Sequence, residues 1–207
     1  MRDILINAPF VDGKLSAGQV AQQVKQNEEV SLQAKELQAL NNIVMGKLVE
    51  HPVYKAAALP MKVAAPFYAR YTKGMSYGDH VDDPIMQAER PYRSDISITV
   101  FLNDPADYEG GELAIRTSFG ETKVKLAAGD AVMYPSSSVH HVNEVTDGIR
   151  VVAVTWLQSL VRDPAQREIL YDLYQLREKM LSSDSESDDT KRLDRSYVNL
   201  VRMWGDV

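Results

Sequence analysis

The pattern of apolar positions first predicts a helix between about Ser31 and Glu50. Apolar residues recur there at steps of three and four positions, which places them on one face of an α-helix. The stripe consists of Leu37, Leu40, Val44 and Leu48. Ser31 is suited to cap the start of this helix, and Pro52 follows its end, where a helix should already have stopped. A shorter helix is expected near Ala17–Val24.

From Met61 to Leu160 the pattern changes to short strands. In the clearest of them, apolar residues alternate with Ser97, Thr99 and Phe101, so we expect a strand with one strongly apolar face. Those apolar residues are Ile96, Ile98, Val100 and Leu102. Further candidate strands are Lys62–Tyr71, Glu112–Arg116, Thr122–Leu126, Ala131–Tyr134 and Ile149–Leu157. Many short strands, separated by glycine, proline and aspartate, favour a sandwich or jelly roll over a parallel sheet.

After Arg162 the helical period returns. Asp163-Pro164 is a suitable N-cap and first-turn pair for a helix. The apolar residues that follow on one face are Ile169, Leu173, Leu176 and Met180. The polar, acidic segment Ser182–Lys191 has no apolar anchors, so it predicts a flexible connection. The closing segment Tyr197–Trp204 is apolar enough that we expect it to pack on the domain or on a second subunit, which makes a homodimer reasonable.

The bulk properties describe one domain with appendages. The chain has 207 residues, a net charge of −6 and no cysteine. The charge argues against nucleic acid as a partner, and the lack of cysteine excludes disulfides and thiolate metal sites and fits the cytoplasm. We expect no signal peptide and no membrane span. The pattern divides the chain into residues 1–60, an N-terminal helical support region, 61–161, a jelly-roll domain, and 162–207, a C-terminal helical extension.

Histidine and aspartate side chains form a candidate metal site. His80 and Asp82 lie two residues apart, so in an extended segment both point to the same face. With one distant histidine they form the two-histidine, one-carboxylate set that holds non-haem Fe(II) and leaves positions open for small molecules. A polar pair on a surface loop is the alternative. His140 and His141 both compete for the distant ligand, since only one of two neighbours in a strand points inward.

Arg150 is the second candidate for chemistry. It lies in the apolar run IRVVAVTWL, where a buried guanidinium group is costly unless it meets an anion. A dicarboxylate that is held by a bidentate arginine is a good partner. The alternative is a structural salt bridge with an aspartate or glutamate. We favour the dicarboxylate, because Arg150 accompanies the candidate iron ligands.

Six segments of the chain carry a family resemblance. They read AALPMKVAAPFYARY, GMSYGDHVDD, RSDISITVFLNDP, DYEGGELAI, KLAAGDAVMYPSSSVHHV and GIRVVAVTWLQSLVRDPAQRE. Over about half of its length the chain therefore resembles the PKHD-type hydroxylases, a bacterial group akin to the prolyl 4-hydroxylases among the Fe(II)/2-oxoglutarate-dependent dioxygenases. The resemblance implies a mainly β fold with flanking helices, built on a double-stranded β-helix (jelly roll). One departure is Tyr197-Val198-Asn199, where relatives commonly carry Tyr-His-Asn.

The resemblance also implies a set of metal ligands. In the family pattern P-S-S-S-x-H the ligand histidine falls on His140, which joins His80 and Asp82 around Fe(II). His141 falls on a position that varies among relatives, so the resemblance makes it a neighbour of the site. A contribution of His141 to substrate contact stays open.

The resemblance further implies how 2-oxoglutarate is held. The family's co-substrate arginine lies ten residues after the ligand histidine and falls on Arg150. Tyr71 and Tyr77 match tyrosines that precede the H-x-D pair in the family, and one of them is expected to donate its hydroxyl to the co-substrate.

The implied activity is hydroxylation of an unactivated C–H bond with Fe(II), 2-oxoglutarate and O2, which releases succinate and CO2. Kinship with the prolyl 4-hydroxylases makes a prolyl or other residue of a peptide or protein the leading substrate. The alternatives are hydroxylation of a small-molecule metabolite and, less favoured, a non-catalytic metal-binding jelly-roll sensor. Ascorbate (L-ascorbic acid) is an expected reductant on the ground of kinship alone.

Overall fold

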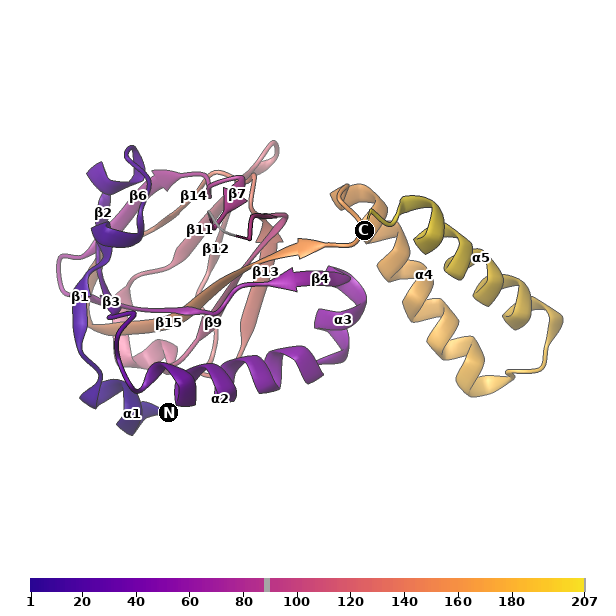
Figure 1. Cartoon of the computed structure of the whole chain (residues 1–207), viewed down its shortest axis with the longest axis horizontal. Coiled ribbons are helices and arrows are strands. Elements are labelled where there is room, and N and C mark those ends of the chain that lie inside the picture. Colours follow the sequence, from indigo (N-terminus) through magenta and orange to yellow (C-terminus); the bar gives the residue numbers. More distant parts are fainter. Residues whose placement is uncertain (88–89, 207) are drawn as a thin grey trace.

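Two antiparallel β-sheets pack against each other and carry the helices on their outside (Figure 1). The structure is a computed structural model, and it describes residues 1–87 and 90–206. Apolar side chains from both sheets, among them Phe101, Leu113 and Val152, form one buried cluster between the two layers. This architecture is the double-stranded β-helix that the sequence predicts, and the prediction of fold class is confirmed.

The larger sheet runs in the order β1-β3-β5-β15-β9-β13, while β10 and β4 pair with the two ends of the long strand β15. Its strands are β1 (Phe10–Asp12), β3 (Glu28–Val30), β4 (Pro60–Val63), β5 (Phe67–Thr72), β9 (Ile96–Phe101), β10 (Tyr108–Gly110), β13 (Ala131–Pro135) and β15 (Val145–Ser159). The predicted strand Lys62–Tyr71 is thus divided between β4 and β5. Pro66, which has no backbone N–H to donate to a ladder, lies in the break.

The smaller sheet runs in the order β12-β11-β14-β6-β2. Its strands are β2 (Lys25–Gln26), β6 (Ser76–His80), β11 (Leu113–Thr117), β12 (Gly120–Val124) and β14 (His140–Val142). Strands β7 (Ile85–Met86) and β8 (Tyr92–Arg93) form a separate hairpin beside them. Three short 3-10 helices, η1 (Gly13–Ser16), η2 (Ala21–Gln23) and η3 (Pro105–Asp107), complete the β domain.

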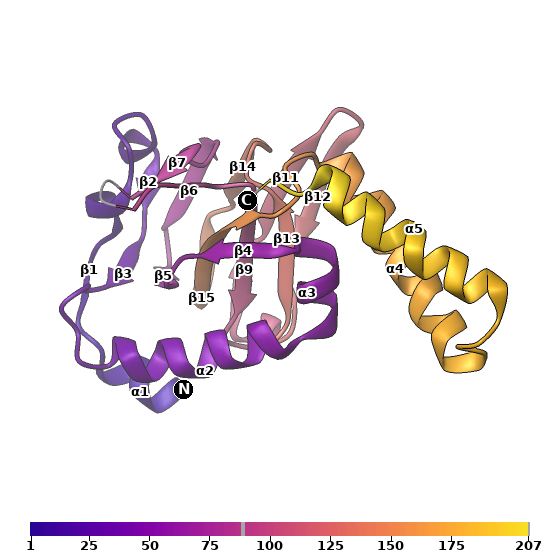
Figure 2. The same cartoon turned by 45° about the vertical axis from the view of Figure 1, so that its right-hand side comes forward.

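Helix α2 (Leu37–Glu50) covers the outer face of the larger sheet (Figure 2). Three residues of its predicted apolar stripe, Leu40, Val44 and Leu48, are buried in one cluster with Ile98 and Val100 of β9, and Leu37 packs against that cluster while partly buried. The helix begins later than predicted, because the backbone N–H of Ser31 donates to the carbonyl of Pro9 and its hydroxyl bonds to Gln33. Pro52 does follow the end of α2.

The remainder of the N-terminal region differs from the prediction. It contains α1 (Arg2–Asn7) and α3 (Pro52–Ala58), but the helix expected over Ala17–Val24 is only the single turn η2. Residues 1–60 also supply strands β1, β2 and β3, so this region is not purely helical. These strands are two or three residues long, which is too short to show a period of two.

Strand β9 has the strongly apolar face that the sequence predicts, and its other face is buried as well. All six of its residues are buried. One face packs beneath α2, and the other, with Ser97 and Thr99, faces the interior of the sandwich, where Thr99 lines a cavity. The second sheet covers what would otherwise be a solvated face.

The C-terminal extension is a helical hairpin that projects from the sheets (Figure 1). It consists of α4 (Pro164–Ser183) and α5 (Asp188–Trp204), and the carboxylate of Asp163 caps α4 as predicted. The buried face of α4 centres on Leu170, whereas Ile169 and Leu176 are each 48% exposed, so the predicted apolar face is displaced by one position.

The segment Ser182–Lys191 is not the predicted flexible connection, because it contains the end of α4, a short turn and the start of α5. The hydroxyl of Ser187 caps α5, and Thr190 is buried and donates to the carbonyl of Asp184. Tyr197 of α5 packs against Tyr174 of α4, with 6.3 Å between the ring centroids. The closing segment therefore packs on its own hairpin, and contact with a second subunit stays a prediction, as does the division into three regions.

Within the described ranges, no helix is both long enough and apolar enough to cross a membrane.

Candidate active site

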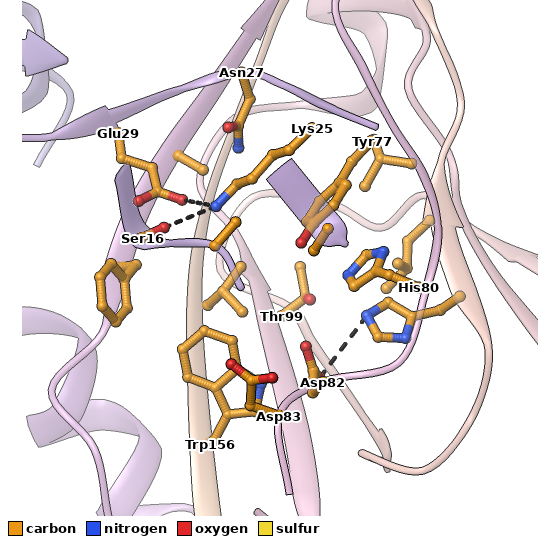
Figure 3. Close-up of a pocket in the computed structure, with 18 of the residues that line it drawn as sticks. Ser16, Lys25, Asn27, Glu29, Tyr77, His80, Asp82, Asp83, Thr99 and Trp156 are labelled. Atoms are coloured by element: carbon orange, nitrogen blue, oxygen red, sulfur yellow. Dashed lines mark hydrogen bonds and ion pairs between the residues drawn. The ribbon is translucent and has the colours of Figure 1, made fainter. Parts of the chain in front are cut away.

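His80, Asp82 and His140 come together beside the smaller sheet, and Figure 3 shows two of them, His80 and Asp82, close to each other. His80 is the last residue of β6 and lies opposite His140, the first residue of β14, in the strand register. One potential ligand atom from each of the three side chains lies within 4.8 Å of the others. Because β6 ends at His80, Asp82 reaches the group from the following loop and not from the same strand face.

Hydrogen bonds fix how both imidazole rings are presented. Nδ1 of His80 lies 2.8 Å from the carbonyl of Gly78, and Nδ1 of His140 lies 2.9 Å from the carbonyl of Ser138. Since a carbonyl only accepts, each Nδ1 carries the proton and each Nε2 keeps a free lone pair. Burial, with the neighbouring His140, lowers the pKa of His80 to about 4. With Nδ1 of each ring held by a carbonyl, Nε2 of each ring is the atom that a metal would meet, so the donor set fits Fe(II).

His141 points to a different set of residues. Its Nδ1 lies 3.0 Å from Oδ1 of Asp79, and its Nε2 lies 3.0 Å from Oδ1 of Asn143. Of the two histidines that competed on sequence grounds, the structure thus brings only His140 to His80 and Asp82.

Two buried serines stand behind the carboxylate of Asp82. The hydroxyl of Ser97 lies 2.5 Å from Oδ2 of Asp82, and the hydroxyl of Ser136 lies 2.7 Å from that of Ser97. The same Oδ2 lies 3.8 Å from Nε2 of His140. Sequence reasoning did not select either serine, although the polar positions on β9 were a signal that this strand faces more than a core.

Arg150 is buried in the middle of β15 with unused hydrogen-bonding capacity. It is 1% exposed, and its guanidinium carbon lies 5.0 Å from the centroid of the Tyr71 ring and 5.7 Å from that of Phe101. Its Nε and Nη1 atoms have no hydrogen-bond partner among the described residues. Burial lowers the pKa of Arg150 below its ordinary value. Within the part of the chain that the structure describes, Arg150 forms no salt bridge with an aspartate or glutamate, and an anion would satisfy its free N–H groups.

A cavity of about 150 Å³ connects these features, because the three candidate ligands and Arg150 all line it. Tyr71 and Tyr77 line it as well. The Tyr77 ring stacks on the imidazole of His80 with 3.7 Å between centroids and 12° between planes. Burial raises the pKa of Tyr71 to about 12 and also raises that of Tyr77, so both phenols stay protonated and able to donate at neutral pH.

A segment that we call the N-terminal strap, residues 13–30, forms another wall of the cavity. Its strand β2 pairs with β6 of the smaller sheet and its strand β3 with β5 of the larger one. Lys25 and Glu29, which lie on these two strands, form a buried ion pair of 2.5 Å, and Lys25 also donates to Ser16 at 2.8 Å (Figure 3). The strap therefore ties the two sheets together beside the site.

The wall formed by the larger sheet is aromatic. Phe67 and Trp156 both line the cavity and meet edge to face, with 5.7 Å between centroids. Nε1 of Trp156 is buried and has no partner in the described part of the chain. The exposed carboxylate of Asp83 also lines the cavity. The sequence did not single out the strap or these aromatic residues, because they match no short motif.

Comparison with known proteins shows the family to which this chain belongs. The sequence model of the 2OG-Fe(II) oxygenase superfamily matches residues 66–158. The chain is 51% identical to a PKHD-type hydroxylase of Thioalkalivibrio sulfidiphilus and 44% identical to one of Acaryochloris marina, in both cases over 100% of this chain and 93% of the relative.

Solved structures share the fold at low sequence identity. A prolyl hydroxylase of Trichoplax adhaerens, solved in complex with a hypoxia-inducible-factor peptide fragment, is 14% identical, with a TM-score of 0.53 over 81% of this chain and 77% of that one. An oxidoreductase of the 2OG-Fe(II) oxygenase family from Burkholderia pseudomallei is 13% identical, with a TM-score of 0.51 over 75% and 74%. The chain belongs to the PKHD-type hydroxylases of the 2OG-Fe(II) oxygenase superfamily and is a 2-oxoglutarate-dependent dioxygenase that needs Fe(II), 2-oxoglutarate and O2.

Proposed function

We propose that this enzyme hydroxylates an unactivated C–H bond in a prolyl or other residue of a peptide or protein. In this proposal His80, Asp82 and His140 hold Fe(II), and Arg150 holds the distal carboxylate of 2-oxoglutarate. The observation that supports it most is the pairing of a candidate metal-ligand cluster with a fully buried guanidinium group, whose Nε and Nη1 atoms lack a partner among the described residues, in the walls of one cavity. A buried cation of this kind is costly to keep without an anionic ligand.

An arginine and a tyrosine have separate roles in binding 2-oxoglutarate in this proposal. The guanidinium group of Arg150 offers Nε–H and Nη1–H to a carboxylate, and the rings of Tyr71 and Phe101 hold it in place. The phenol of Tyr71 or Tyr77 supplies a further donor to the co-substrate. When bound, Fe(II) supplies the oxidising chemistry that couples conversion of 2-oxoglutarate and O2 into succinate and CO2 to hydroxylation of the substrate. Ascorbate as a reductant stays a prediction.

The cavity walls suit a small apolar group next to the metal ligands. Phe67, Val154 and Trp156 line the cavity together with the metal ligands. Such walls exclude water from the reacting centre. A proline ring matches them in size and polarity, and the Trichoplax relative in fold is a prolyl hydroxylase that was solved with a peptide. This chemistry supports a peptidyl substrate ahead of a charged metabolite, and membership of an enzyme family leaves no support for the sensor alternative.

The first test needs no substrate. Apo-protein is mixed with Fe(II) and 2-oxoglutarate without oxygen, and we expect a visible metal-to-ligand charge-transfer band. After oxygen is admitted, the band should bleach as succinate forms. Arg150→Met should weaken the band at a fixed 2-oxoglutarate concentration, whereas the control His141→Ala should leave it unchanged. Absence of the band in protein that holds iron would contradict the proposed site.

The second test addresses the substrate. Proline-containing peptides and a panel of small metabolites are incubated with the loaded enzyme, and products are examined by mass spectrometry. We expect a peptide that gains one oxygen atom on a proline, in step with succinate. If only a small molecule is oxygenated, the peptide part of the proposal is wrong while the assignment of iron and 2-oxoglutarate stands.

A further inference from the structure

The carboxylate of Asp82 is the least anchored member of the candidate ligand set. The two histidines belong to paired strands, and their rings are held by backbone carbonyls. Asp82 lies beyond the end of β6 in a segment without regular structure. An aspartate on a loop can turn its carboxylate away from a metal, so something else has to hold this side chain in place.

Two serine hydroxyls supply that anchor. Ser97 is 0% exposed and lies 2.5 Å from Oδ2 of Asp82, while Ser136 is 2% exposed and lies 2.7 Å from Ser97. Ser97 is the second residue of β9, and Ser136 follows the end of β13, its neighbour in the larger sheet. The chain of hydrogen bonds therefore ties a loop next to the smaller sheet to two paired strands of the larger sheet.

The direction of these hydrogen bonds follows from the groups involved. An ionised carboxylate only accepts, so Ser97 must donate its single proton to Asp82. The contact between the two hydroxyls then requires Ser136 to donate to Ser97. Ser136 thereby keeps the Ser97 proton directed at Asp82, and each hydroxyl has a defined role.

From this geometry we infer that Ser97 is a positioning residue for the metal site and that Ser136 orients it. This inference rests on the proposed role of Asp82 as a ligand, but the family match gives neither serine a role. Hydrogen bonds behind a metal-bound carboxylate typically contribute about 10–100-fold to metal affinity. We therefore expect Ser97→Ala to weaken metal binding by about that factor. Ser136→Ala should weaken it less, because Ser97 can still donate.

The experiment measures metal alone, so it does not depend on the unknown substrate. Co(II), a redox-stable substitute for Fe(II), is titrated into the full-length apo-protein and followed by its visible absorption, and thermal unfolding of the apo-protein is recorded in parallel. The matched control is Ser159→Ala, because Ser159 is equally buried in the larger sheet, but its hydroxyl donates to the carbonyl of Leu59 and accepts from the backbone N–H of Val161.

The expected result separates positioning from folding. Ser97→Ala should lose metal affinity and change the Co(II) absorption spectrum, while Ser159→Ala keeps both and loses only thermal stability. Wild-type Co(II) affinity in folded Ser97→Ala would overturn the inference. If Ser97→Ala does not fold, Ser136→Ala serves as the test. Wild-type Co(II) affinity and an unchanged absorption spectrum in Ser136→Ala would then overturn the inference.

Asp82→Ala distinguishes this inference from the proposal beneath it. If Asp82→Ala also binds Co(II) like wild type, the proposed ligand set is wrong. If Asp82→Ala loses the metal and both serine variants retain it, only the role of the serines is wrong.

Discussion

The two faces of strand β9 differ in what they contribute. Ile96, Ile98 and Val100 pack in the cluster beneath α2, whereas Ser97 and Thr99 face the interior between the sheets. The first face removes apolar surface from water and so stabilises the fold. The second places buried hydroxyls beside the proposed metal ligands, where each one costs stability unless it is hydrogen-bonded. Alternate residues of this one strand thus contribute either to the core beneath α2 or to the surroundings of the candidate site. Substitutions on the two faces should therefore have different effects.

The largest effect is expected for Asp82→Ala, on the interior side. Loss of a ligand should abolish metal binding and succinate formation together, well beyond the roughly 10–100-fold that loss of a supporting hydrogen bond causes. The apo-protein should stay folded, because Asp82 contributes no apolar contact to either core cluster. Metal titration and circular dichroism of the same sample check the loss of metal binding and the retention of the fold. A fully active Asp82→Ala would contradict the ligand assignment.

The opposite result is expected for Ile98→Ala, on the helix side. Ile98 is 0% exposed, and its truncation should lower the free energy of unfolding by about 2–5 kcal/mol. Metal affinity of the protein that remains folded should match wild type. Urea unfolding and Co(II) titration below the unfolding transition make this comparison. A loss of metal affinity at full folding would show that the two faces are coupled.

The alternation in β9 shows how far sequence reasoning reaches. The period of two identifies the strand and its two faces, and the stripe in α2 identifies the helix that covers one of them. The alternation by itself assigns no role to Ser97, because a polar face on an antiparallel strand usually meets water. Only the second sheet, which forms through long-range pairing, shows that this face is interior.

The site was partly predictable for the same reason. The H-x-D pair is a local motif, and its two side chains do meet His140 in the structure. The choice of His140 over His141 needed the family pattern, because alternation alone left both open. The strap was missed, since β2 and β3 are two and three residues long and their pairing is not local. The prediction that Ser182–Lys191 is flexible was wrong, because it relied on the polar composition of the segment and did not consider that Ser187 could cap a helix.

A smaller effect is expected for Arg150→Met, which removes a charge from the interior side. Hydrogen bonds to charged groups contribute about 1.5–3 kcal/mol, so the 2-oxoglutarate concentration needed for half-maximal succinate formation should rise roughly 10–100-fold. Thermal stability of the apo-protein should hold or increase, because a buried cation with two unsatisfied nitrogen atoms is replaced by an apolar side chain. An unchanged 2-oxoglutarate requirement would make Arg150 structural instead.

The smallest effect is expected for Tyr77→Phe. The ring that stacks on His80 is kept, so Co(II) affinity and apo-protein stability should match wild type. Only the hydroxyl is lost, and a neutral hydrogen bond of about 0.5–1.5 kcal/mol corresponds to a few-fold rise in the 2-oxoglutarate requirement. Tyr71→Phe, measured beside it, identifies which phenol contacts the co-substrate, because the other substitution should leave the requirement unchanged. If neither variant changes it, the hydroxyls are not co-substrate donors, and Arg150 alone among the predicted residues distinguishes 2-oxoglutarate from other keto acids.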